Sequence, residues 1–393
     1  MNKNILIGTL AVTIAKGSVL FFYFKKQTPK ERVLLQTYFT YTQEETDRLT
    51  KKSSNQVLDF DDVKRFDDIA YQLISKNTQN QTFTEATSKV YAYLAMAERD
   101  FAFLSYNTSG EFMGSFDSLA KKTLCMFFPS DCELILTRDE PDAYSNEIES
   151  IVFLKIRDRM NKEAPRLKGY ELKIGGGYWN GPQPSVGIRA GNNAGWFISS
   201  GSQFRLPPPP AYDSKEFKDQ LDITVQRLKD ASAKEKLATV SWAGGPGTNT
   251  MPGHMLEFGT EYLLGKKIAF TQFLLVRSVL AGAVADAETA AFDSKYAYQV
   301  KRPFIMDSTL KSIMPTPNHP SYPSGHSTLS AAGTSVLIHF FPEDRELLEA
   351  VAEEAGMSRV WGGIHYMMDH ETGRTLGKGV GEEAIKKTQM TFR

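Results

Sequence analysis

The strongest constraint on this fold is the spacing of its apolar residues, which follows the period of an α-helix over most of the 393-residue chain. Val90, Leu94, Ala97, Phe101 and Leu104, for example, recur at intervals of four and three residues. This is the pattern of one helix face packed against another helix. No stretch shows the convincing alternation of apolar and polar residues that is typical of a half-buried strand. We therefore predict an all-α fold.

Composition divides the chain into an apolar segment, a helical half, an irregular connection and a second helical half, at residues 1–28, 29–168, 169–212 and 213–393. The connection is rich in Gly and Pro and ends near four consecutive prolines, which favour turns and extended backbone. In the second half, one long helical run is expected from about Glu261 to Lys301.

Charge and hydropathy exclude some classes of protein. Lys+Arg and Asp+Glu both number 46, so the net charge is zero and a nucleic-acid partner is not expected. The only long apolar stretch runs from Ile5 to Phe24, with Lys16 near its centre. We interpret it as an export signal or a single membrane anchor, which predicts a periplasmic or extracellular protein. The alternative is an N-terminal core helix in a cytoplasmic protein.

The chain has two cysteines, Cys125 and Cys132, which are too few for a disulfide scaffold or a thiolate metal site. They could pair in an oxidising compartment, but two unpaired buried thiols are the simpler expectation.

The first of three segments with chemical potential contains Lys295, Arg302 and Pro303. Seven residues on a continuous helix complete about two turns, which would put Lys295 and Arg302 on one face. Pro303 biases Arg302 away from helical backbone and can direct its guanidinium over a pocket. Taken alone, two cations on one face also fit a solvated surface.

The second segment contains Ser324, Gly325 and His326, which follow Pro323. A run of small residues comes next, so Ser324 and Gly325 should open a helix whose free N–H groups can bind an anion. His326 could exchange a proton near neutral pH. A plain capped helix start is the alternative.

The third segment contains Arg359, His365 and Asp369. His365 and Asp369 are four residues apart, so on one helical turn the carboxylate can accept the proton of one ring nitrogen. The other nitrogen is then available as a ligand or a nucleophile. A buried histidine with a satisfied hydrogen bond is the alternative.

The three segments together resemble the superfamily of type-2 phosphatidic acid phosphatases (PAP2) and vanadium-dependent haloperoxidases. The shared patterns are Lys, six residues, Arg-Pro; Pro-Ser-Gly-His; and Ser-Arg, five residues, His, three residues, Asp. The segments next to these patterns look like those of the soluble bacterial haloperoxidase branch. These segments are the Trp242 loop to Pro252-Gly253-His254, the segment 286–303, His319-Pro-Ser-Tyr-Pro and Ala355-Gly-Met-Ser-Arg. The resemblance covers about 213–383 and implies a helical-bundle core with long irregular loops.

The resemblance also implies a cofactor, vanadate, and a role for each site residue. His365 would be the metal ligand, oriented by Asp369. The vanadate oxygens would be held by Lys295, Arg302, Ser324, Gly325 and Arg359. His326 would act as acid and base, and Lys295 would polarise hydrogen peroxide. The expected activity is oxidation of a halide by hydrogen peroxide, with a small organic molecule as the final acceptor.

His319 occupies the position that, in the family, carries a histidine in bromide-oxidising members and an aromatic residue in chloride-oxidising ones. This implies a preference for bromide and iodide, with a loop-capping role for His319 as the alternative.

Two other functions stay open at this point. An acid phosphatase would use His365 as a nucleophile to form a phosphohistidine, with His326 protonating the leaving alcohol. A non-catalytic oxyanion-binding protein would keep the cations without turnover. The sequence does not give the organic acceptor or the oligomeric state.

Overall fold

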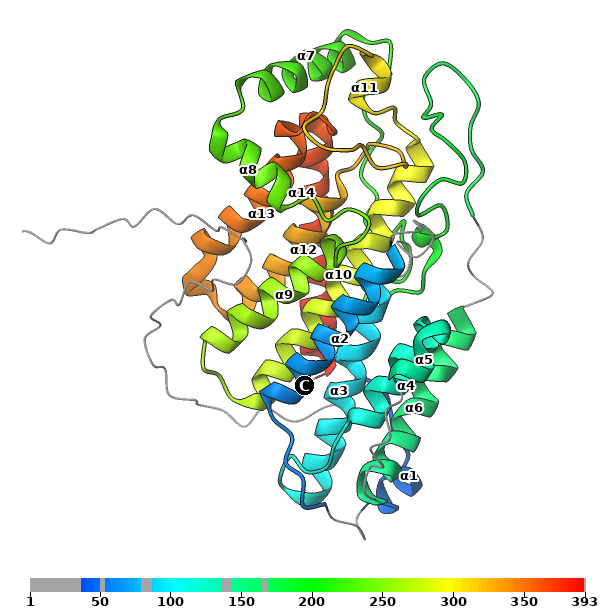
Figure 1. The fold of residues 1–393 in the computed structure, drawn as a ribbon, viewed down its shortest axis with the longest axis vertical. Coiled ribbons are helices and arrows are strands. Elements are labelled where there is room, and N and C mark those ends of the chain that lie inside the picture. Colours follow the sequence, from blue (N-terminus) through cyan, green and yellow to red (C-terminus); the bar gives the residue numbers. More distant parts are fainter. Residues whose placement is uncertain (1–36, 50–53, 79–86, 136–142, 164–168, 392–393) are drawn as a thin grey trace, which may run out of the picture.

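A computed structural model describes residues 37–49, 54–78, 87–135, 143–163 and 169–391 (Figure 1). The apolar segment from Ile5 to Phe24 lies outside the described residues, so the prediction of a signal or anchor is not tested there. Within the described ranges the chain forms α-helices, and its extended contacts are limited to isolated β-bridges, Val57 with Met113 and Tyr178 with Val300. The all-α prediction is confirmed.

Helices of the N-terminal half are α1 (Gln43–Asp47), α2 (Phe60–Thr78), α3 (Thr87–Ser109), α4 (Asp117–Phe127), α5 (Cys132–Ile135) and α6 (Ala143–Glu163). Helices of the C-terminal half are α7 (Lys215–Asp230), α8 (Ala233–Ser241), α9 (Thr250–Gly265), α10 (Phe270–Tyr298), α11 (Pro303–Met306), α12 (Gly325–Phe340), α13 (Arg345–Trp361) and α14 (Met367–Thr391). Single 3₁₀ turns lie at Pro129–Asp131, Ala190–Asn192 and Pro342–Asp344.

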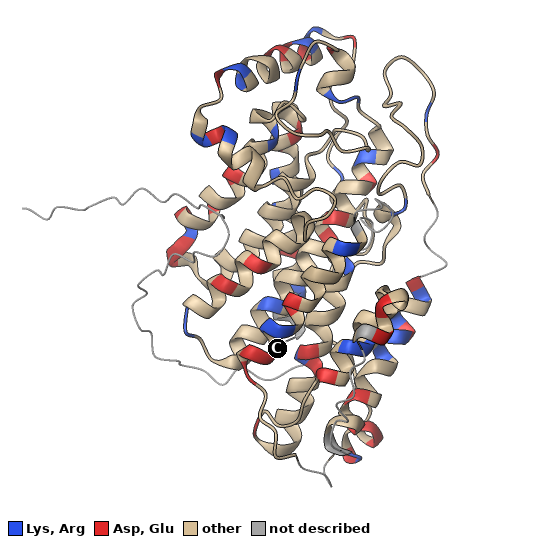
Figure 2. Ribbon diagram, in the orientation of Figure 1, with Lys and Arg blue, Asp and Glu red and all other residues tan. Residues whose placement is uncertain are grey.

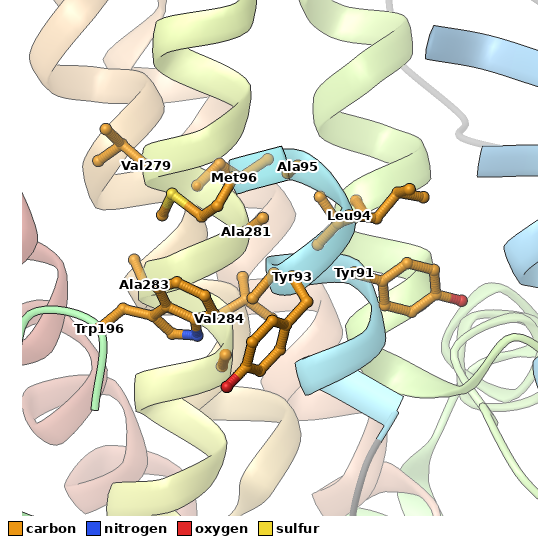
Figure 3. Close-up of a cluster of buried hydrophobic side chains, with 14 of the residues drawn as sticks. Tyr91, Tyr93, Leu94, Ala95, Met96, Trp196, Val279, Ala281, Ala283 and Val284 are labelled. Atoms are coloured by element: carbon orange, nitrogen blue, oxygen red, sulfur yellow. The ribbon is translucent and has the colours of Figure 1, made fainter. Parts of the chain in front are cut away.

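Helix α10 is the centre of the bundle and packs against α3, α9, α12 and α14. Among the described helices, α10 is the one long and apolar enough to cross a membrane, but 83% of its most apolar window lies inside the protein. Its composition is therefore that of a core helix. Figure 3 shows Tyr93 and Met96 of α3 facing Ala281 and Val284 of α10, with Trp196 beside them. Both helical halves contribute to this one apolar core.

The connection at 169–212 is irregular, as expected, and is attached to α10 by buried acids. Asp286 accepts hydrogen bonds from the N–H groups of Trp196, Phe197 and Ile198, at 2.7, 2.7 and 3.0 Å. Two helical turns further along α10, Asp293 accepts both guanidinium bonds of Arg205, each 2.7 Å long. These contacts hold the connection against the helix that ends next to the candidate site.

The long helical run expected from Glu261 to Lys301 is broken, because α9 ends at Gly265 and α10 begins at Phe270. Lys267, in the intervening turn, has a left-handed φ of 51°. At its other end α10 stops at Tyr298, where Gln299 is left-handed with φ 53° and its N–H donates to the carbonyl of Lys295. The helical period alone did not reveal either stop.

The expectation of two unpaired thiols was wrong, since Cys125 and Cys132 form a disulfide. Cys125 lies in the last turn of α4 and Cys132 opens α5, so the intervening turn brings the two Cα atoms to 5.0 Å. That separation falls within the range that a disulfide requires.

Along the described helices seen in Figure 2, Lys and Arg are interspersed with Asp and Glu. This distribution agrees with the zero net charge.

Candidate active site

The three segments singled out in the sequence converge at one end of the bundle, beside α7, α8 and α11 (Figure 1). Lys295 comes from the last turn of α10, Arg302 from the residue before α11, and His326 from the first turn of α12. Arg359 lies in the last turn of α13, and His365 and Asp369 lie around the start of α14. Residues up to 74 positions apart in the sequence thereby share one buried site.

His365 and Asp369 form the predicted pair, with His365 Nδ1 2.7 Å from Asp369 Oδ2. The pair does not lie on one helical turn, however. His365 precedes α14, and Asp369 lies in the first turn of that helix. Asp369 Oδ2 also accepts from Ser321 Oγ at 2.5 Å and from the N–H of Tyr366 at 3.2 Å. Asp369 Oδ1 is buried without a hydrogen-bond partner.

The contacts of His365 fix its tautomer. Arg302 Nη1 lies 2.9 Å from His365 Nε2, and a guanidinium can only donate. Nε2 therefore accepts, and the ring proton is on Nδ1, where it is donated to Asp369. Burial lowers the pKa of His365 well below its ordinary value, and the charges of Arg302 and Lys295 lower it further. The result is a neutral imidazole whose single Nε2 lone pair accepts from Arg302, so a ligand bound at Nε2 would replace that hydrogen bond.

Lys295 and Arg302 meet in the site, but not by sharing a helix face as the seven-residue spacing predicted. The helix ends between them, and Arg302 has extended backbone with φ −74° and ψ 154°, as Pro303 predicted. Lys295 Nζ donates to the carbonyls of Pro320, Ser321 and Pro323. Arg302 Nε donates to the carbonyl of His319 at 3.0 Å, and Nη1 to that of Ile364 at 2.8 Å.

Arg359 is the third cation and is fully buried. Its Nη2 donates to the carbonyl of Thr239 at 2.6 Å and its Nε to Ser358 Oγ at 2.9 Å. In the part of the chain that the structure describes, no carboxylate forms an ion pair with Arg359, Arg302 or Lys295. Burial lowers the pKa of Arg359 to about 9 and that of Arg302 to about 10.

Burial also lowers the pKa of Lys295 well below its usual value, and the nearby Arg302 charge acts in the same direction. The negative charge of Asp369 acts on Lys295 and Arg302, whereas burial alone lowers the pKa of Arg359. Unpaired buried charge is costly, so this arrangement favours the binding of an anion. Among the described residues, no group of three or more His, Cys, Asp or Glu side chains could hold a metal cation.

Ser324 opens α12 as predicted, because its hydroxyl caps the helix by accepting from the N–H of Ser327 at 3.4 Å. A Cβ added to Gly325 would meet nothing within 4 Å. The first turn of a helix has N–H groups without intrahelical partners. Gly325 therefore presents open space beside N–H groups that can bind an oxyanion.

His326 donates from Nε2 to the carbonyl of Trp242 at 2.7 Å, which leaves Nδ1 as an acceptor. Burial lowers its pKa well below the ordinary value, and the charge of Arg359 lowers it further. His326 is therefore neutral and able to take up a proton at Nδ1 when an anion offsets the cations.

His319 lies directly beside the cations rather than on a remote loop. Its Nδ1 lies 3.0 Å from Arg302 Nη2 and 3.1 Å from the carbonyl of Pro320, and its ring packs edge to face with that of Phe292, with centroids 5.2 Å apart. Burial lowers the pKa of His319 well below the ordinary value, with Arg302 and Lys295 adding to the effect.

Sequence reasoning gave no role to two residues of this region, Ser321 and His254. Ser321 lies inside the His319-to-His326 motif, but its type and spacing gave no signal for its bond to Asp369. His254, in the first turn of α9, has its ring 6.2 Å from that of Trp242, and its buried Nδ1 has no partner. Burial lowers the pKa of His254 to about 4, and Arg359 contributes to this shift.

Residues 273–390 match the PAP2 superfamily, and this range contains every predicted site residue from Lys295 to Asp369. A non-specific acid phosphatase of Salmonella typhi is 25% identical over 211 residues, covering 46% of this chain and 71% of the phosphatase. The likeness to this superfamily therefore covers the part of the chain that holds the predicted site residues.

Solved structures extend the likeness to most of the chain. A bacterial vanadium-dependent iodoperoxidase matches 86% of this chain and 98% of its own, with a TM-score of 0.63 and 20% identity. A bacterial vanadium-dependent chloroperoxidase matches 81% of this chain and 92% of its own length, with a TM-score of 0.59 and 12% sequence identity. The fold over most of the chain is that of these bacterial vanadium-dependent haloperoxidases, and residues 273–390 match the PAP2 superfamily.

Proposed function

We propose that this protein is a vanadate-dependent haloperoxidase, which uses hydrogen peroxide to oxidise bromide or iodide to hypohalite for transfer to a small organic acceptor. The observation that carries the proposal is a buried set of three cationic side chains without carboxylate ion pairs among the described residues, beside a neutral histidine whose Nε2 carries no proton and accepts from Arg302. The likeness to a bacterial iodoperoxidase over 86% of the chain supports it. The likeness to the phosphatase covers only 46%.

The residues present fit vanadate, a tetrahedral oxyanion. His365 would bind the metal through Nε2, because its Nδ1 is committed to Asp369. Lys295, Arg302 and Arg359 would pair with the oxygens through charge-assisted hydrogen bonds. Ser324 and the N–H of Gly325 would add neutral donors beside the open space at the start of α12. In this arrangement the anion compensates the charge that the protein leaves unpaired.

Bound vanadate supplies a Lewis acid that activates hydrogen peroxide towards a halide. The chain's own residues supply charge, orientation and a proton site. Asp369 keeps the proton of His365 on Nδ1, and the cations hold negative charge in a buried setting where electrostatic interactions are strong. His326 takes and returns a proton at Nδ1, while its Nε2 stays bonded to the carbonyl of Trp242.

A preference for bromide and iodide over chloride follows in this proposal from His319. Its imidazole is bonded to Arg302 and adds a polar group next to the cations. A phenyl ring there would leave the region drier and the oxidant more electrophilic.

An acid phosphatase is the second candidate, because the Salmonella typhi relative is one and the same atoms could serve it. His365 Nε2 would attack phosphorus, and the three cations would stabilise the transferring group. Binding of an oxyanion without turnover is the remaining alternative.

One experiment separates these functions. The purified full chain is reconstituted with orthovanadate and assayed with hydrogen peroxide and iodide, bromide or chloride. In parallel, vanadium-free protein is assayed for phosphate release from p-nitrophenyl phosphate. Vanadium-dependent oxidation of iodide and bromide supports the proposal. Phosphate release alone favours the phosphatase, and tight oxyanion binding with neither activity favours a binding protein.

We also propose an exported or membrane-anchored location, from the apolar stretch between Ile5 and Phe24. The disulfide between Cys125 and Cys132 supports it, because disulfides persist mainly in oxidising compartments.

A further inference from the structure

Ser321 is fully buried and contacts three parts of the site at once. Its hydroxyl donates to Asp369 Oδ2 at 2.5 Å. Its carbonyl accepts from Lys295 Nζ at 2.7 Å. Its N–H donates to the carbonyl of Val300, between Lys295 and Arg302, at 2.9 Å. One residue thus joins the end of α10, the loop before α11 and the start of α14.

We propose that Ser321 is a positioning residue, whose hydroxyl fixes the Asp369 carboxylate and, through it, the orientation of His365 Nε2 towards the oxyanion. The inference rests on the proposed oxyanion site. In this role Ser321 neither transfers a proton nor contacts the anion directly.

The unequal bonding of the two Asp369 oxygens carries the argument. Oδ2 accepts three hydrogen bonds, from Ser321, His365 and the N–H of Tyr366, whereas the buried Oδ1 has none. Without the Ser321 hydroxyl, Oδ2 would keep two donors, and rotation of the carboxylate would cost less. The His365 ring would then be oriented less strictly. Loss of such an orienting partner typically weakens metal affinity about 10- to 100-fold.

The hydroxyl can be removed without removing the other contacts of Ser321. In Ser321→Ala, the backbone bonds to Lys295 and Val300 remain possible because they use the carbonyl and the N–H. The variant therefore tests the hydroxyl's bond to Asp369 together with its longer contact to His365 Nδ1, at 3.4 Å, and the double-mutant cycle below separates the two. Ser330→Ala is a matched control, since Ser330 is also fully buried in this region and donates to the carbonyl of His326.

The test measures the dissociation constants of orthovanadate and inorganic phosphate by calorimetry on the full chain, with thermal unfolding recorded for each variant. Ser321→Ala should weaken orthovanadate binding about 10-fold or more, while Ser330→Ala should leave it within about twofold. A purely structural role for Ser321 would lower the unfolding temperature of both anion-free and anion-loaded protein without changing affinity in the surviving folded fraction.

A double-mutant cycle with Asp369→Asn identifies the path of the effect. If Ser321 acts through Asp369, adding Ser321→Ala to Asp369→Asn should weaken orthovanadate binding by less than about threefold. An equal loss in both backgrounds overturns the inference, as does wild-type affinity in Ser321→Ala. Should the alanine variant not fold, Ser321→Cys replaces it with a similar volume and a weaker donor. Failure of both to fold, when Ser330→Ala folds, assigns Ser321 a structural role and overturns the proposal.

The outcome is separable from that of the proposed function. If wild-type protein binds orthovanadate but lacks haloperoxidase activity, the function fails while the affinities still test Ser321. If wild-type protein binds neither orthovanadate nor phosphate, both proposals are overturned.

Discussion

Replacing Arg359 with methionine should make the anion-free protein more stable and the site unable to bind its anion well. Arg359 is fully buried, and its hydrogen bonds go to neutral acceptors such as Thr239 O and Ser358 Oγ. Folding therefore takes a charged group out of water without giving it an opposite charge. An apolar side chain of similar length avoids that cost and can pack against the neighbouring thioether of Met314.

The magnitude follows from the pKa of Arg359, which burial lowers from its ordinary value to about 9 in the folded chain. At 1.36 kcal/mol per unit of pKa, the charged form is disfavoured by about 5 kcal/mol on folding. The cost is fully present below about pH 9, and it fades as the pH rises from there towards the ordinary pKa of an arginine. The substitution also leaves the Thr239 carbonyl without a donor, which lowers the free energy of unfolding by about 1–3 kcal/mol. The net gain at pH 7 is about 2–4 kcal/mol.

The assay is thermal unfolding in phosphate-free buffer, with and without orthovanadate. Without the anion, Arg359→Met should unfold several degrees above wild type. Orthovanadate at 100 times its dissociation constant should stabilise wild type by about 2.7 kcal/mol and the variant by much less. Arg277→Met is the matched control, because Arg277 is equally buried but paired with Asp67 and Glu98. Breaking those pairs should destabilise by about 3–5 kcal/mol. An Arg359→Met protein less stable than wild type without anion would refute the reasoning.

Other expected outcomes concern the proposed function and location. His365→Ala should lose vanadium binding and activity together, and a wild-type vanadium content by elemental analysis would contradict its role as ligand. His326→Ala should keep vanadium while turnover falls about 10²- to 10⁴-fold; an affinity loss as large as that of His365→Ala would merge the two roles. Wild type should oxidise bromide and iodide with little chloride turnover, and His319→Phe should alter that profile, so an unchanged profile across the three halides removes His319 from selectivity. Fractionation should place the full chain in the membrane or exported fraction, and a wholly cytoplasmic location would reject the signal or anchor.

Short motifs predicted part of the local geometry of the candidate site. Ser324 caps a helix and Pro303 imposes extended backbone on Arg302. The contact of Asp369 with His365 was also predicted, but on one helical turn, whereas His365 lies before the helix. Each of these depends on residues that are adjacent in the chain, so each can be inferred without knowing the rest of the fold.

The sequence did not predict where helices stop within apolar stretches. Gln299 adopts left-handed backbone at the end of α10, although it is neither Gly nor Asn. Its side-chain amide is held there by the carbonyls of Glu171 and Tyr296. The contact with Glu171 crosses 128 positions of sequence, so it becomes visible only when the connection is folded against α10.

The contacts of Ser321 and the disulfide were also not predicted from the sequence. The partner of Ser321 lies 48 residues away, and serine has no spacing signal of its own. Cys125 and Cys132 are near in sequence, but pairing requires the turn between α4 and α5 to bring their Cα atoms together. Composition alone made free thiols the simpler expectation.

Attachment of the connection to α10 by Asp286 and Asp293 has a consequence for redesign. Residues between Trp196 and Arg205 are fixed at both ends to the helix that carries Lys295. A change of length there would strain the end of α10 that carries Lys295, and a shortened or grafted segment should lower the proposed activity before it alters the proposed halide preference. Ile174, at 99% exposure, lies outside the segment from Trp196 to Arg205. Insertions, labels or tethers to a surface are therefore better placed around Ile174 than within that segment.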